Sequence, residues 1–124
     1  MAGTIVADTL QDGAGNSTAM DNAIYGSAKA WVNFNGVTTT TIRASYNVSS
    51  VTRVTTGVYT VNFTNALTDT NYCAVNSSGG TASILGAVSY ENNTARTTTS
   101  FTFYVYNSSI TIADAAYCNV AIFR

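Results

Sequence analysis

"NVSSVTRVTTGVYTVNF" (residues 47–63) is the stretch that decides the fold. Its second half has the period of two that marks a β-strand with one face in a core, because successive side chains point to opposite faces. Tyr59, Val61 and Phe63 share one face, and Val58, Thr60 and Asn62 share the other. Gly57 can adopt the positive φ that a tight turn needs. The stretch therefore predicts an antiparallel β-hairpin.

The segment before this hairpin has the same pattern. In "KAWVNFNG" (29–36), Ala30, Val32 and Phe34 point one way, whereas Trp31 and Asn33 point the other. The β-branched run "TTTTIR" (38–43) follows, and the Asn-Gly pair at 35–36 is a favoured turn. Residues 29–43 are therefore predicted to form a first hairpin.

The rest of the chain is predicted to be short strands separated by polar loops. The predicted strands are 72–76, 82–90, 100–107 and a last strand in which Cys118, Val120 and Ile122 share a face. The predicted loops are 65–71, 77–81 and 91–99, and Gly86 is expected at a bulge or at a close backbone contact. Since no segment shows a helical period, residues 29–124 are predicted to form an all-β, antiparallel β-sandwich of about eight short strands.

Residues 1–28 differ from this domain and are predicted to be an extended N-terminal arm with a flexible loop. Ile5, Val6 and Leu10 are its few large apolar residues, and the Gly-rich stretch 13–17 consists of turn formers. Such an arm needs a surface on which to dock, either its own domain or a neighbouring subunit.

The composition limits the possible partners. Charged residues make up 9% of the 124 residues, against about 25% in an ordinary domain. Five scattered basic residues and a net charge of −1 give no basic stripe, so nucleic-acid binding is not expected. The polar residues are instead Thr, Ser and Asn, which suit contacts with sugars or other protein copies, although Thr also simply fills strand positions.

Two classes of segment are not found in the sequence. No apolar run approaches the 18 residues of a membrane helix, so membrane insertion is not expected. The start lacks a basic region followed by a long apolar segment, so we expect the protein to be made and folded in a cytoplasm.

The side chains of catalysis are scarce. There is no His, which removes the usual general base and the commonest metal ligand. A glycosidase needs two carboxylates facing each other, but five Asp lie in predicted loops or in the arm. We therefore expect no catalytic residue, no metal and no cofactor, and the protein is predicted not to be an enzyme.

Two faint motifs have simpler interpretations. Asp12 and Asn16 in "DGAGNS" could donate oxygens to calcium, but the spacing lacks the middle carboxylate and the closing Glu, so a plain turn is predicted. Cys73 and Cys118 are predicted to be small buried core residues rather than a disulfide, because a cytoplasm is reducing.

Outward aromatic residues are the candidates for contacts between molecules. Trp31, the only Trp, is either a sugar-stacking platform or a buried anchor in the first hairpin or at a subunit contact. Tyr104 and Tyr106 lie opposite the core face of their strand, so either oligomerisation covers them or their hydroxyls meet solvent. With the apolar residues of the arm, the candidate subunit interface is Ile5, Val6, Leu10, Trp31, Tyr104 and Tyr106.

Three phrases in this order and spacing, "AKAWVNFNG", "IRASYNVSSVT" and "GVYTVNFTNALTDTNYCAV", resemble a module of tailed-bacteriophage and prophage virion proteins. That module is often found at the distal end of tail fibres, and the resemblance covers about residues 28–76. It implies an all-β knob in a virion, assembled as a homotrimer, in which Lys29, Trp31 and Asn33 meet a neighbouring element or subunit. It supplies no catalytic or binding residue.

Two functions are compatible with these observations. The first is an adhesin knob that contacts a host surface glycan or protein through its loops, with Ser77, Ser78, Asn92, Asn93 and Arg96 as candidate recognition residues. The second is a capsid decoration (cement) or tail-assembly protein that binds other virion proteins, in which residues 1–28 clamp neighbouring subunits. Both place the protein in a virion.

Overall fold

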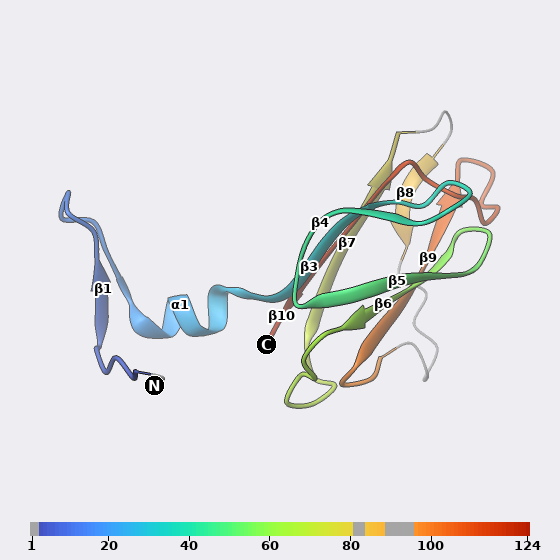
Figure 1. The fold of residues 1–124 in the computed structure, drawn as a ribbon. Coiled ribbons are helices and arrows are strands. Elements are labelled where there is room, and N and C mark those ends of the chain that lie inside the picture. Colours follow the sequence, from blue (N-terminus) through green and yellow to red (C-terminus); the bar gives the residue numbers. More distant parts are fainter. Residues whose placement is uncertain (1–2, 81–83, 89–95) are drawn as a thin grey trace.

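Two four-stranded antiparallel sheets form a sandwich in the computed structural model, which describes residues 3–80, 84–88 and 96–124 (Figure 1). The first sheet has the order β4-β3-β10-β7, with bounds β3 (Ala28–Asn35), β4 (Thr41–Tyr46), β7 (Cys73–Gly79) and β10 (Tyr117–Phe123). The second sheet has the order β5-β6-β9-β8, with bounds β5 (Val48–Thr55), β6 (Val58–Phe63), β8 (Ile84–Val88) and β9 (Ser100–Asn107). The predicted all-β sandwich is confirmed.

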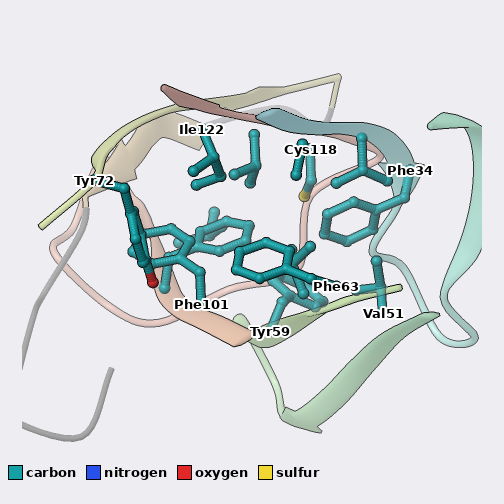
Figure 2. Packing of buried hydrophobic residues seen from close by; sticks show 14 of the residues in the cluster. Phe34, Val51, Tyr59, Phe63, Tyr72, Phe101, Cys118 and Ile122 are labelled. Carbon is teal, nitrogen blue, oxygen red and sulfur yellow. The ribbon is translucent and has the colours of Figure 1, made fainter. Parts of the chain in front are cut away.

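The alternation in the sequence becomes the two inner faces of the sandwich. Phe34, Cys118 and Ile122 of the first sheet point toward Tyr59 and Phe101 of the second (Figure 2). The rings of Phe34 and Tyr59 meet edge to face across the core, with centroids 5.2 Å apart, a geometry that adds about 0.5–1.5 kcal/mol to the area they bury. The largest fully buried side chains are Tyr59, Phe34, Phe101, Phe103, Ile122, Val32, Val61, Val105 and Cys118.

The hairpin predicted for 47–63 is confirmed as β5 and β6. Only Thr56 and Gly57 connect the two strands, and Gly57 has a φ of +65°. A Cβ on Gly57 would also lie 2.5 Å from the side chain of Ile112 and 2.7 Å from the nitrogen of Ala113. The turn therefore needs glycine for its backbone angle and for its packing.

The hairpin predicted for 29–43 is confirmed as β3 and β4, but the turn prediction was wrong. The connection runs from residue 36 to residue 40, so Asn35 and Gly36 do not form a two-residue turn. Gly36 instead donates its N–H to the carbonyl of Ala115, and a Cβ there would lie 2.5 Å from the Tyr59 hydroxyl. The glycine is required because another part of the chain packs against it.

The single residue Asn47 carries the chain from the first sheet to the second, between β4 and β5. It adopts a φ of 53°, and its amide Nδ2 donates to the carbonyls of Lys29 and Asn65 at 3.0 and 3.2 Å. Its Oδ1 accepts from the backbone N–H of Asn65 at 2.8 Å. The side chain thus fixes both the corner and the loop that follows β6.

Replacing Asn47 with alanine is expected to lower the free energy of unfolding by about 2 kcal/mol, because the side-chain hydrogen bonds are lost and alanine disfavours positive φ. Denaturant unfolding measures the loss. Asn47→Gly keeps the backbone angle and removes only the hydrogen bonds, so it should lose less. Equal stability of the alanine variant and the wild type would contradict this role.

The β7 strand is longer than predicted. It continues through Ser77 and Ser78 to Gly79, because both serines pair with β10, opposite Asn119 and Cys118. The prediction of a loop at 77–81 was therefore wrong for Ser77, Ser78 and Gly79, whereas a recognition role of the two serines stays a prediction. The irregularity predicted at Gly86 is confirmed, since the β8–β9 register shifts between Ile84 and Gly86.

The two cysteines have different surroundings. Cys118 is fully buried, as predicted, whereas Cys73 is exposed on the outer face of β7, so the prediction of a second core cysteine was wrong. Cys73 pairs with Phe123, five residues along β10 from Cys118, which corresponds to about 17 Å. Both thiols are free.

The N-terminal segment contains structure that the sequence did not predict. The short strands β1 (Thr9–Gln11) and β2 (Ser17–Ala19) form an antiparallel hairpin, and helix α1 (Met20–Gly26) follows. The expectation of no helix was wrong for these seven residues, none of which is buried. Figure 1 shows the segment lying to one side of the sandwich. In the described part of the chain, no helix has the length and apolarity to cross a membrane.

Candidate functional site

An apolar stripe crosses the outer face of the first sheet. The strand registers place Tyr46, Trp31, Ala121 and Val75 opposite one another on β4, β3, β10 and β7. Tyr46 is 59% exposed, Trp31 40% and Val75 55%. Trp31 is therefore not a buried anchor within its own chain, and this part of the prediction was wrong. Its role at a subunit contact or with a sugar stays a prediction.

A polar row runs beside the stripe. The next register line places Asn33, Asn119 and Ser77 side by side. Asn33 Nδ2 donates to Asn119 Oδ1 at 2.6 Å, and Asn119 Nδ2 donates to Ser77 Oγ at 3.2 Å. Since these amides bind one another, the row presents a flat, uncharged surface next to the exposed aromatic rings.

The charged side chains of these four strands are all basic. The strands contain Lys29 and Arg43 but no Asp or Glu. The guanidinium of Arg43 lies 4.5 Å from the ring centre of Tyr117 and donates to the carbonyl of Ala116 at 2.7 Å. Lys29 Nζ donates to the carbonyl of Ile24 in α1. The outer face of the first sheet is thus apolar with a weakly positive margin.

A cavity of about 300 Å³ lies next to this face, near Tyr46. Its lining includes Lys29, Tyr46, Asn65 and Arg124. Arg124 forms an ion pair with Asp69 at 2.6 Å, and this hydrogen bond lowers the pKa of the Asp69 carboxyl. Because Arg124 is paired with Asp69, Lys29 is the cation of the lining that has no carboxylate partner among the described hydrogen bonds.

The structure does not bring the six predicted interface residues together. Ile5, Val6 and Leu10 lie exposed in the N-terminal segment, and Trp31 lies on the outer face of the first sheet. Tyr104 and Tyr106 lie on the opposite side of the molecule, on the outer face of β9 in the second sheet, where both are half-buried. The six residues therefore do not lie on one surface of the molecule.

The three predicted recognition residues that the structure describes do not form one surface either. Ser77 lies on the outer face of β7, whereas Ser78 points inward with its hydroxyl buried. Arg96 donates to the carbonyl of Tyr72 and lies 5.1 Å from the centre of its ring. Asn92 and Asn93 lie outside the described residues.

A polar cluster centred on Asp114 was missed by the sequence analysis. Asp114 lies between β9 and β10, and its Oδ1 accepts from the Gly57 N–H and the Tyr59 hydroxyl, each at 2.7 Å. Arg53 donates to both carboxylate oxygens, the shortest contact being 2.7 Å. The side chains of Arg53 and Asp114 are 30% and 17% exposed. No spacing in the sequence relates these residues, so only the fold could reveal them.

The hydrogen bonds of this cluster stabilise the ionised form of the Asp114 carboxyl group. Partial burial raises the pKa of Asp114, but the hydrogen bonds from Arg53, Gly57 and Tyr59 outweigh it, so the pKa lies below the usual 3.8. Burial is the largest cause that raises the pKa of the Tyr59 hydroxyl, and the hydrogen bond to Asp114 raises this pKa further. All partners of Asp114 are structural groups of this chain, and the cluster ties the β9–β10 connection to the β5–β6 hairpin.

The calcium-like stretch of the N-terminal segment is a hydrogen-bonded turn. Asp12 Oδ1 accepts from the N–H groups of Ala14 and Asn16, both at 2.9 Å, and Oδ2 accepts from Asn16 Nδ2 at 2.8 Å. These hydrogen bonds lower the pKa of Asp12, and the bond from the Asn16 side chain has the largest effect. Over residues 3–80, 84–88 and 96–124, no three His, Cys, Asp or Glu side chains come together as a metal site would need.

No protein-family model, curated protein or solved structure matches this chain.

Proposed function

We propose that this protein is a non-enzymatic structural component of a bacteriophage virion, a homotrimeric tail-fibre or adhesin knob that contacts the host surface. The observation that carries the proposal is the apolar stripe of Tyr46, Trp31 and Val75 across the outer face of the first sheet. Exposed aromatic and aliphatic side chains in one row favour contact with another molecule. The resemblance of residues 28–76 to phage virion modules supports the virion location.

The chemistry of the described residues supports contact rather than catalysis. The Asp114 carboxylate is occupied by Arg53, Gly57 and Tyr59, and Asp12 by its own turn. Rows of Asn, Ser and Thr beside aromatic rings are suited to a host glycan or to a second protein surface. The partners proposed are further copies of this chain, other virion proteins and a host surface glycan or protein.

A capsid decoration or tail-assembly role is the second candidate. It is favoured by the N-terminal segment, in which Ile5 and Val6 are 85% and 93% exposed and α1 buries no residue. An exposed apolar segment next to a rigid domain is well suited to clamp a neighbouring subunit. Locating the protein in purified particles separates the two roles, because many copies over the head would favour decoration and few copies at the tail would favour the adhesin.

The test of self-association is a double substitution, Trp31→Ala with Tyr46→Ala. We expect sedimentation equilibrium to give the wild type three times the chain mass of 13.0 kDa and the double variant a smaller mass, because the variant loses the two largest exposed rings of the stripe. Val54→Ala is the control, since Val54 is 61% exposed but lies on β5 of the other sheet. A monomeric wild type, or a double variant that assembles as fully as the control, would contradict the proposal.

A further inference from the structure

We infer that the outer face of the first sheet is the docking site for the N-terminal segment of a second copy of this chain. The inference rests on the proposed self-association but not on the virion location. Two surfaces of the same chain leave large apolar side chains exposed, the stripe of Tyr46, Trp31 and Val75 and the N-terminal segment, whose described contact with the first sheet is the hydrogen bond from Lys29 to the carbonyl of Ile24.

The N-terminal segment has the exposed apolar groups that such docking requires. Ile5 is 85% exposed, Val6 93%, Leu10 44% and Ile24 48%. The helix buries none of its residues. Burying apolar side chains of this size favours association. Because the hairpin and α1 lie to one side of their own sandwich, the sandwich of another copy is the natural surface for them (Figure 1).

The charges of the two surfaces are complementary. Residues 1–28 contain three Asp and no Lys or Arg, whereas residues 29–124 contain all five basic residues of the chain. The outer face of the first sheet has no acidic side chain, and Lys29 and Arg43 lie on it. Arg43 has a ring and a carbonyl as its described partners, not a carboxylate. Because Asp12 is held in its own turn, Asp8 and Asp21 are the acidic side chains that would meet this weakly positive face.

Docking of this kind is compatible with the proposed homotrimer. A segment of one copy that binds a different surface on the next copy makes a heterologous contact, and such contacts close into a ring when the rotation allows it. Three copies, each giving its segment to the next, would satisfy every segment and every stripe.

Cysteine cross-linking in the full-length protein tests this inference, with the native Cys73 as reporter. Cys73 is exposed on the docking face, while Cys118 is buried and its thiol pKa is raised to about 12 by burial and by the nearby Asp114, so it will not react at neutral pH. We expect Val6→Cys or Leu10→Cys, treated with a short bismaleimide, to give covalent dimers on a denaturing gel. The dimers should disappear when Cys73→Ser is added to the same variant.

The control is Ile110→Cys, which places an equally accessible thiol in the β9–β10 connection, where Ile110 is 79% exposed. It should give no Cys73-dependent dimer. If the protein sediments as an oligomer but neither arm variant cross-links to Cys73, the docking site is overturned while the proposed self-association stands. If the protein is monomeric, both are overturned. Cross-links in the arm variants that depend on Cys73, without any in the control, support the inference.

Discussion

Replacing Asp114 with alanine is expected to lower the free energy of unfolding by about 3 kcal/mol, since a largely buried carboxylate with five hydrogen-bond contacts is removed. The substitution leaves the Arg53 guanidinium and the buried Tyr59 hydroxyl without this acceptor. It also frees the β9–β10 connection from the β5–β6 turn. Urea unfolding measures the loss, and we expect a melting temperature about 10 °C lower.

The loss should depend on pH in a defined direction. The folded pKa of Asp114 lies below the ordinary 3.8, so its contribution is complete above that value and is lost as the pH falls through the folded pKa. Wild type and Asp114→Ala should therefore differ by a constant amount between about pH 5 and pH 8 and converge in more acidic solution. Asp114→Asn, which keeps the shape but not the charge, should behave like the alanine variant at neutral pH and lose somewhat less.

Asp69→Ala is the matched control for this experiment. Asp69 also pairs with an arginine, but both side chains of that pair are solvent-exposed, at 34% and 42%. Exposed ion pairs stabilise little, because water and salt screen them. If Asp69→Ala and Asp114→Ala lose the same stability, or if the Asp114→Ala difference persists unchanged below the folded pKa, the cluster does not hold the β9–β10 connection to the β5–β6 hairpin as its geometry indicates.

The sandwich was predictable because its strands have one inner face and one outer face. Burial on one side forces the period of two, so Tyr59, Val61 and Phe63 could be assigned to the core from their spacing alone. The same reasoning correctly placed Ala30, Val32 and Phe34 inside. The alternation is clearest in β3, β9 and β10, where buried and more exposed residues follow each other along the strand.

The predictions that failed concern contacts between segments distant in the sequence. Gly36 was assigned to a turn because the Asn-Gly pair favours one, whereas the Tyr59 hydroxyl and the carbonyl of Ala115 are what exclude a side chain there. Ser77 was assigned to a loop by its composition, but pairing with β10 extends the strand. Local propensity is a weak guide wherever a neighbouring strand offers hydrogen bonds.

The candidate site was only partly predictable for a related reason. The sequence indicates which side chains point outward, and so it named Trp31, but it does not reveal register. Only the pairing of β4, β3, β10 and β7 places Tyr46, Trp31 and Val75 in one row. Helix α1 was missed because seven residues with no buried face leave no periodic pattern.

Phe103→Ala is expected to have the largest effect of any single substitution discussed, a loss of about 3–5 kcal/mol in the free energy of unfolding. Phe103 is fully buried, and its ring centre lies 6.3 Å from that of Phe34 and 5.7 Å from that of Tyr59, so it connects the two sheets. Truncation removes these contacts and leaves a cavity that the rigid strands around it cannot fill. Chemical denaturation gives the value directly.

Two further variants serve as comparisons for Phe103→Ala. Phe103→Leu keeps most of the volume and should recover more than half of the loss. Phe123→Ala, on the partly exposed outer face of β10, should cost much less. Similar losses for Phe103→Ala and Phe123→Ala would mean that the ring cluster between the sheets is not what holds the sandwich together.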